Sequence, residues 1–420
     1  MSSDVSLPNR TESRYGMADC GEFIEALAGR FRPISFSDKN FVQTIYFNND
    51  DHEVPFGTSL KLRRYVSDPT QPVLSGDGYF LEIKRGRDKQ KDKVRIGLDI
   101  EGARQYVNVM SPGMAEPLRP YMAVVYNRQH FVPSDGSQAR LTVDGGMRYF
   151  FFRDDGAEPM GEEAAVSRVE LKESSQNNAS MFVKDMLSGF GAVPIVSKKC
   201  KGHYFVNEYH VGYKGKKFHR ELPETEVEAK LGATGEMSFR QIKELFRTGH
   251  LSFVLLEHFP FTVESGSIQR YYRHNGRVFK VSYKEGGATR VEKGIKVVLD
   301  DPLHLGCVVR RTEKKDIAVP FDSPIITSEY RELYKMKKAF YVRNMVTNRF
   351  YHLSVDCCTG LGDPLYQMEI EYTGTFGEII RAGNAQDDVV KDIATIAAAA
   401  MSIDSALKPT QLTKEEWTKI

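Results

Sequence analysis

The sequence predicts an α+β protein of two tandem domains, each an antiparallel β-barrel flanked by helices. Three observations predict it. Six elements recur in the same order in the two halves of the chain. Charged residues alternate with apolar ones along most expected strands, so one face of each strand is charged. Few helices are expected, too few to cover the apolar faces of so many strands in a single layer.

Bulk composition excludes several classes of protein. The 420 residues include 58 Lys and Arg against 56 Asp and Glu, a formal charge of only +2, so no overall polarity points to nucleic acid or a membrane. The five cysteines contain no CxxC pair and are typical of reduced thiols rather than disulfides or a zinc site. Neither a signal peptide nor an 18-residue apolar run is recognised, which predicts a soluble cytoplasmic protein.

The first half begins with a charged segment and a short helix for which Asp19 is a suitable N-cap. A second helix is expected near 178–188. The segments expected to form the first half are, in order, TESRY (11–15), QTIYF (43–47), SLKLRRY (59–65), YFLEIKRG (79–86), ARLTVDGG (139–146) and SRVELK (167–172).

The second half repeats this order. A helix begins near Ser238, again a suitable N-cap, with apolar residues at helical spacing, and another is expected over about 386–402. The expected segments are EVEAK (226–230), IQRYY (268–272), FKVSYK (279–284), TRVEK (289–293), YHLSVDCC (351–358) and YQMEIEY (366–372).

These repeats place the domain boundaries. The polar stretch VGYKGKKFHRELPE contains Gly, Lys and Pro, which predicts a linker over 205–221. We expect a disordered N-terminus over 1–9, domains over 10–204 and 222–405, and a C-terminal tail or helix over 406–420.

Residues i, i+2 and i+4 of a strand share a face, and on these strands the shared face is nearly all Arg, Lys and Glu. Any one strand is compatible with an ordinary sheet that has one solvated face. Together they favour barrels with a charged interior, where charges must pair with each other or with a bound ion. Many cations and a few carboxylates suit a polyanion with a divalent metal.

The motifs resemble the triphosphate tunnel metalloenzyme superfamily, which includes CYTH proteins, tunnel-type RNA triphosphatases and the polyphosphate polymerase domain of vacuolar transporter chaperone (VTC) complexes. The resemblance implies an eight-stranded antiparallel tunnel in each half. The first half is most similar to the VTC domain, in ESRY (12–15), TIYFNND (44–50), LKLRRY (60–65), YFLEIKRG (79–86), YNRQHF (126–131), ARLTVD (139–144), RVELK (168–172) and VPIVSKK (193–199).

Matched to those motifs, Glu170 would hold a metal. The residues that would bind phosphate or line the tunnel are Arg14, Lys61, Arg63, Lys84, Lys93, Arg95, Tyr126, Arg128, Lys172, Ser197 and Lys198. The run that holds Lys93 and Arg95 is equally compatible with a solvated hairpin. Ile195 stands where the family commonly has a basic residue.

The second half is similar to the broader CYTH and RNA triphosphatase group. EVEAK fits an E-x-E-x-K signature, and MEIEY fits a paired-glutamate strand. The resemblance implies metal ligands at Glu226, Glu228, Glu369 and Glu371, and phosphate contacts at Lys230, Lys280, Lys284 and Arg290. Arg270, Arg310, Arg311, Lys335 and Lys337 are unranked candidates.

We therefore expect metal-dependent phosphoryl transfer with Mn²⁺ or Mg²⁺. The leading hypothesis is synthesis of inorganic polyphosphate from ATP in the first domain. The alternatives are a tripolyphosphatase or nucleoside triphosphatase centred on the second domain, and a non-catalytic polyphosphate or nucleotide sensor. Expected partners are ATP or another nucleoside triphosphate and inorganic polyphosphate or triphosphate, with nucleic acid only as an RNA 5′-triphosphate end.

Overall fold

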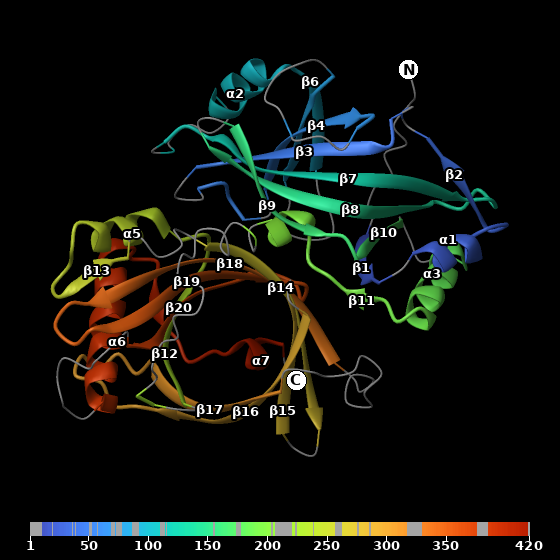
Figure 1. Ribbon diagram of the computed structural model, residues 1–420. Coiled ribbons are helices and arrows are strands. Elements are labelled where there is room, and N and C mark those ends of the chain that lie inside the picture. The colour runs from blue at the N-terminus through green and yellow to red at the C-terminus, as the bar shows by residue number, and fades with distance from the viewer. Residues whose placement is uncertain are drawn as a thin grey trace. The chain divides into compact units, whose positions relative to one another are not determined.

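The computed structural model describes most of residues 11–418 in two compact units (Figure 1). Met1–Asn49 and Glu53–Val206 belong to unit 1, and Asn207–Ile420 belongs to unit 2. Outside the described residues lie 1–10, 19, 36, 38, 50–52, 57, 69–71, 73–77, 86–91, 110–113, 115, 154–155, 174–177, 203–204, 206–220, 223–224, 238, 257–262, 275–276, 285–286, 317–329, 376–384 and 419–420.

Unit 1 is an antiparallel sheet flanked by helices. Its strands are β1 (Thr11–Met17), β2 (Phe31–Ile34), β3 (Phe41–Asn48), β4 (Ser59–Val66), β5 (Phe80–Arg85), β6 (Asp92–Gly97), β7 (Arg119–Pro133), β8 (Ala139–Arg153), β9 (Gly156–Glu163), β10 (Ser167–Glu173) and β11 (Val193–Pro194). Its helices are α1 (Gly21–Ala26), α2 (Ile100–Val109) and α3 (Asn178–Gly189).

Eight of these strands follow one another in the order β1-β10-β8-β7-β3-β4-β5-β6, with β11 beside β1, β2 beside β7 and β9 beside β8. The pairings seen in the described part of unit 1 do not join β6 to β1, so here the sheet is not closed into the expected tunnel. Helix α2 packs on apolar side chains of β3 to β5 and β7, and α1 and α3 pack on those of β1, β8 and β10. The helices therefore cover the apolar face of the sheet.

Unit 2 contains a closed eight-stranded antiparallel barrel. Its elements are β12 (Thr225–Ala233), α5 (Phe239–Arg247), β13 (Phe253–Leu255), β14 (Val263–His274), β15 (Arg277–Lys284), β16 (Gly287–Val298), β17 (Val308–Asp316), β18 (Tyr330–Asn344), β19 (Arg349–Thr359), β20 (Leu365–Thr375), α6 (Ala385–Ile403), β21 (Lys408–Pro409) and α7 (Lys414–Trp417).

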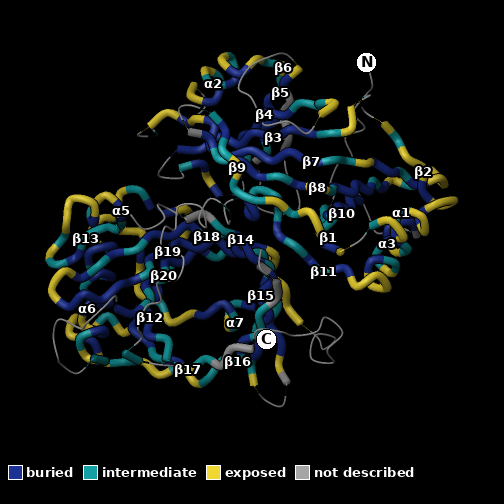
Figure 2. The backbone as a smooth tube through the Cα atoms, in the orientation of Figure 1, coloured by how far each residue is buried: buried dark blue, intermediate teal, exposed yellow. Residues whose placement is uncertain are grey.

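The barrel order is β18-β14-β15-β16-β17-β12-β20-β19, and pairing of β19 with β18 closes it. Helix α6 packs outside the barrel against β12, β17 and β20. Its apolar residues, including Ile393 and Ile396, are buried there (Figure 2). Short helix α7 lies inside the ring of strands (Figure 1).

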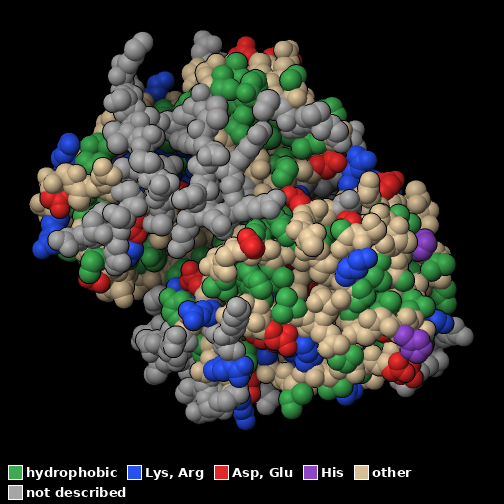
Figure 3. Space-filling model, turned by 180° about the vertical axis from the view of Figure 1, so that it is seen from behind, with side chains coloured by type: hydrophobic (Ala, Val, Ile, Leu, Met, Phe, Trp, Pro, Cys, Tyr) green, Lys and Arg blue, Asp and Glu red, His purple; other side chains and the backbone are tan. Residues whose placement is uncertain are grey.

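The charged residues are segregated by face rather than by region of the surface. On the side of the molecule in Figure 3, basic and acidic side chains are interspersed. Within the sheets, by contrast, charged side chains such as Lys61, Glu82 and Glu228 are less than a tenth exposed. In the part of the chain described, no helix combines the length and apolar character needed to cross a membrane.

Candidate functional site

The polar face of unit 1 carries a group of charged side chains on β1, β4, β5, β7, β8 and β10, joined by Lys198. We call this group the unit 1 cluster. It consists of seven basic residues, Arg14, Lys61, Arg63, Lys84, Arg128, Lys172 and Lys198, and four acidic ones, Glu12, Glu82, Asp144 and Glu170.

Glu82 on β5 is the shared partner of three cations. Its carboxylate is fully buried and lies 2.8 Å from Lys61 Nζ, 3.7 Å from an Arg63 nitrogen and 4.0 Å from Lys84 Nζ. Register explains this, because Lys61 on β4 is directly opposite Glu82. Burial lowers the pKa of Lys61 well below its usual value although Glu82 raises it.

Asp144 on β8 is the shared partner of a second set of basic side chains. Arg128 binds it through two hydrogen bonds of 2.6 and 2.7 Å, and Lys198 Nζ lies 2.5 Å away. Burial alone would raise the pKa of Asp144, but Arg128 and Lys198 hold it well below its usual range. Glu170 on β10 is likewise held as a carboxylate, by Lys172 and by Arg14, whose Nε is 3.8 Å away.

Tyr126 lies in the middle of these cations. Its side chain is 1% exposed, and among the described residues its hydroxyl has no hydrogen-bond partner. The Arg128 guanidinium and Lys198 ammonium lie 5.1 and 4.8 Å from its ring centre. Burial raises the pKa of Tyr126, but Arg128, Arg63 and Lys198 lower it by more. A buried hydroxyl donor beside surplus positive charge is arranged to meet an anion.

Unit 1 does not bring every predicted residue into this cluster. The Ser197 hydroxyl instead contacts Cys200, accepting from its backbone N–H at 3.2 Å, which is a local turn interaction. The side chains of Lys93 and Arg95 lie outside the described residues.

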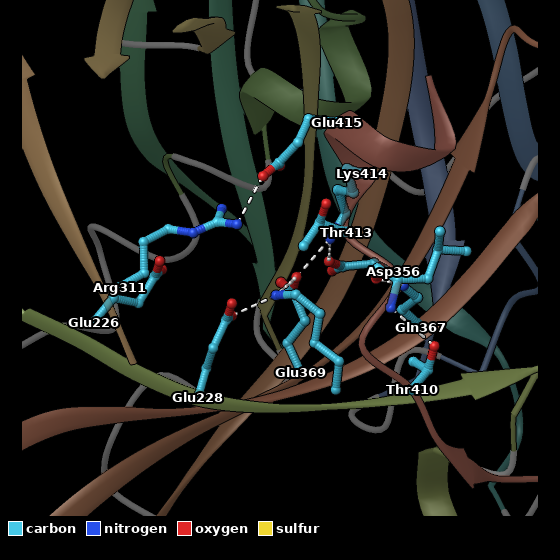
Figure 4. Close-up of polar contacts among 12 residues, drawn as sticks. Glu226, Glu228, Arg311, Asp356, Gln367, Glu369, Thr410, Thr413, Lys414 and Glu415 are labelled. Carbon is cyan, nitrogen blue, oxygen red and sulfur yellow. Dashed lines mark hydrogen bonds and ion pairs between the residues drawn. The ribbon is translucent and has the colours of Figure 1, made fainter. Parts of the chain in front are cut away.

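The barrel interior of unit 2 holds a second group, shown in Figure 4. Lys230 Nζ on β12 lies 2.5 Å from Glu228 and 2.9 Å from Glu369 on β20. Lys335 on β18 reaches Asp356 at 2.5 Å and Glu369 at 3.3 Å. Each carboxylate therefore faces an ammonium group.

Burial and neighbouring charges shift the pKa values of Glu228 and Lys280 in this interior. Burial raises the pKa of Glu228, and neighbouring Glu226 and Glu369 raise it further, whereas Lys230 opposes the shift. Burial and the positive charge of Lys293 lower the pKa of Lys280 to about 7. An anion bound beside Lys280 would raise its pKa again.

Some predicted residues of unit 2 lie elsewhere. Arg290 pairs with Val281 and stacks over the Phe279 ring, 5.9 Å from its centre, on the face opposite Lys280. The structure therefore does not bring Arg290 together with Lys230 and Lys280, with which it was predicted to bind phosphate. The face is set by register with β15, and Lys293 takes the interior position before a register shift in β16. The Lys284 side chain lies outside the described residues, and Glu371 is half-buried on the Glu369 face.

Sequence reasoning missed several interior residues. Asp356 shares a face of its strand with Ser354 and Cys358, so strand alternation in the sequence could have identified it. Lys414 and Glu415 come from the C-terminal tail, where no repeating pattern marked them.

The predicted metal ligands do not assemble a metal centre. Carboxylate oxygens are suitable ligands for Mg²⁺ or Mn²⁺. However, ammonium groups contact Glu226, Glu228 and Glu369, and Glu170 is bound by Lys172. Over the described ranges, no three His, Cys, Asp or Glu side chains are grouped closely enough to hold an ion. In this arrangement the residues do not fit a bound divalent metal.

Comparisons with known proteins give likenesses of structure only. No protein-family model matches the chain, and no curated protein matches it. Solved structures similar to part of the chain include the RNA triphosphatase domain of a mimivirus mRNA capping enzyme, with 12% identity, a TM-score of 0.29, and coverage of 49% of this chain and 100% of that one.

Two others are an RNA triphosphatase from S. pombe and a conserved hypothetical protein from Pyrococcus furiosus. The first has 15% identity and a TM-score of 0.24, and covers 43% of this chain and 80% of its own. The second has 14% identity and a TM-score of 0.26, and covers 45% and 93%. At these values the likenesses carry no functional conclusion, so a function must be argued from the charged residues themselves.

Proposed function

We propose that this protein transfers phosphoryl groups on a triphosphate or polyphosphate chain bound at the unit 1 cluster, and that its reaction is synthesis of polyphosphate from ATP. One observation carries the proposal: seven buried or half-buried basic residues surround four carboxylates and the Tyr126 hydroxyl, for which the described residues offer no hydrogen-bond partner. A chain of phosphates supplies the missing negative charge at repeated intervals, which a single carboxylate ligand does not.

The cluster would act by positioning and charge neutralisation, which dominate catalysis of phosphoryl transfer. Arg63 and Arg128 offer planar guanidinium groups, and Lys61 and Lys198 offer point charges to non-bridging oxygens. Tyr126 would donate its hydroxyl hydrogen to the same chain. These donors are already held by Glu82 and Asp144, so little reorganisation accompanies binding.

In the proposed reaction, a phosphoryl group moves from ATP to the end of the bound polyphosphate chain. The bond between the γ-phosphorus of ATP and its β–γ bridging oxygen breaks, and ADP leaves. A terminal oxygen of the bound polyphosphate forms the new bond to that phosphorus. Hydrolysis differs only in that water replaces this oxygen, and it is the second candidate. Mn²⁺ or Mg²⁺ would enter as the cation carried by the nucleotide, because the described residues do not fit a metal of their own.

The test incubates the whole protein with ATP and Mn²⁺ and separates products by chain length. Polyphosphate longer than a few phosphates is the expected result. Arg63→Met should reduce turnover more than about tenfold, because a hydrogen bond to a charged group is worth about 1.5–3 kcal/mol. Arg64→Met is the matched control, since Arg64 is the next residue of β4 and binds Gln43 on the other face.

The other outcomes are equally clear. Release of ADP and orthophosphate alone would reject the polymerase and leave a triphosphatase. Tight polyphosphate binding without turnover, lost in Arg63→Met, would identify a sensor. Equal losses in both arginine variants would remove the unit 1 cluster from the function.

A further inference from the structure

The C-terminal tail enters the barrel of unit 2 instead of leaving it. Lys408 and Pro409 form β21 beside β12, and the Thr410 N–H donates to the Lys230 carbonyl oxygen at 3.0 Å. Gln367 on β20 then donates to the Leu412 carbonyl oxygen at 2.6 Å. A capping box between Thr413 and Glu416 begins α7, which lies inside the ring of strands (Figures 1 and 4).

Lys414 places an ammonium group between two carboxylates of the barrel wall. Its Nζ lies 2.8 Å from Asp356 and 2.6 Å from Glu369, and the side chain is buried. Four lysines contact the carboxylates of Glu228, Asp356 and Glu369: Lys230, Lys335, Lys414, and Lys337, whose Nζ lies 3.9 Å from Glu369. Without Lys414, three lysines would remain for the three carboxylates, so Lys414 supplies the surplus positive charge in this buried place.

Glu415, the next residue, supplies a negative charge to Arg311 of the barrel wall. Its carboxylate lies 2.7 Å from Arg311 on β17, whose side chain is 6% exposed. Arg311 is directly opposite Glu226 in the register of β17 with β12. The tail therefore brings a cation to the carboxylates and an anion to the arginine, side by side, as Figure 4 shows.

Apolar contacts also hold the tail inside the barrel. Trp417 packs against Tyr271, Leu333, Cys358 and Leu365 on the inner wall. Lys296 donates to the Gln411 carbonyl oxygen at 2.8 Å and reaches Glu416 at 3.1 Å from the rim. The contacts of Lys296 involve exposed partners, which water and salt weaken, whereas the ion pairs of Lys414 and Glu415 are largely buried.

We propose that residues 410–418 are an internal ligand of the unit 2 barrel. Lys414 takes the place of a divalent cation and Glu415 the place of a phosphate group. The tail thus competes with a metal–polyphosphate complex for the same interior. Of the predicted metal ligands, Glu369 is the one that Lys414 contacts directly, whereas Glu228 is held by Lys230 of the barrel wall. The proposal does not rest on the function proposed for unit 1.

The first experiment titrates Mn²⁺ alone into the whole protein and measures binding by electron paramagnetic resonance. Lys414→Met should bind Mn²⁺ at least about tenfold more tightly than the unchanged protein, because a unit positive charge has been removed from beside the carboxylates. Lys408→Met removes an exposed charge of the same tail and should bind as the unchanged protein does. Lys414→Arg keeps the charge and should remain weak.

The second experiment uses Trp417, the only tryptophan in the sequence. Mn²⁺ with inorganic tripolyphosphate should displace the tail, shift the emission to longer wavelength and raise quenching by acrylamide. Arg63→Met, in unit 1, should leave this signal unchanged, which separates the result from the function proposed above. The inference is overturned if Lys414→Met binds Mn²⁺ no better, or if Trp417 emission stays constant while calorimetry records binding to Arg63→Met.

Discussion

At the scale of the residue, buried charge in unit 1 is shared rather than paired one to one. Asp144 forms ion pairs with Arg128 and Lys198, and Glu82 forms ion pairs with Lys61 and two further cations. Loss of one partner from a buried pair costs about 3–5 kcal/mol, because the remaining charge is uncompensated. Loss of a carboxylate strands several cations at once, whereas loss of one cation leaves the carboxylate with another. The carboxylates therefore hold the cluster together, and a single cation can be replaced at a smaller cost in stability.

His130 gives a pH-dependent prediction at this scale. Its side chain is 8% exposed, and burial with nearby Arg128 and Arg140 lowers its pKa to about 3. The unfolded chain has a histidine pKa near 6.5, so between about pH 3 and 6.5 it binds more protons than the folded chain. The stability that neutral His130 contributes is complete above pH 6.5 and is lost as the pH falls through this window.

Replacing His130 by Gln removes that titration. We expect the difference in urea midpoint between the two proteins to be largest in favour of the histidine form near pH 7.5 and to shrink steadily at pH 5.5 and 4.5. Buried carboxylates such as Asp144 titrate in both proteins and cancel in the difference. Midpoints that run parallel across this range would contradict the assignment.

At the scale of the element, strand alternation predicted much of the interior from the sequence. Glu226, Glu228 and Lys230 were expected on one face, and the structure places all three inside the barrel, with Lys230 beside Glu228 and Glu369 and with Glu226 beside Lys293. Alternation groups Arg290 with Glu292 on one face, but it does not say which face is interior, and register with β15 puts Arg290 on the face opposite to Lys280. Lys414 was beyond such reasoning. A residue in a non-repeating tail reaches the interior only through contacts with β12 and β20.

The connection between β19 and β20 offers a prediction about backbone strain. Gly360 and Gly362 both have positive φ, +118° and +104°, where an added Cβ is strained by about 1–2 kcal/mol. At Gly360 that Cβ would also lie 3.2 Å from the Glu332 carbonyl oxygen on β18, whereas at Gly362 nothing lies within 4 Å. Both alanine variants should lower the melting temperature, Gly360→Ala more. Trp417 fluorescence measures it, and equal losses would show that the approach to β18 is unimportant.

At the scale of the whole molecule, the two units carry different charge balances. The unit 1 cluster has seven basic and four acidic residues. The interior of unit 2 brings its own counter-charges through Lys414 and Glu415. A net formal charge of +2 for the chain hides this difference. The units should therefore respond differently to the same anion, even though their strands follow a similar plan.

Calorimetry of the whole protein should separate these responses. We expect two unfolding transitions, of which only that of unit 2 is followed by Trp417. Metal-free tripolyphosphate at 100 times its dissociation constant stabilises the unit that binds it by about 2.7 kcal/mol, which raises the melting temperature of a domain of this size by about 5–10 °C. That shift should appear in the transition that Trp417 does not report, because the tail already occupies the interior of the unit 2 barrel. An equal shift in the Trp417 transition would show that the tail does not exclude anions from the barrel.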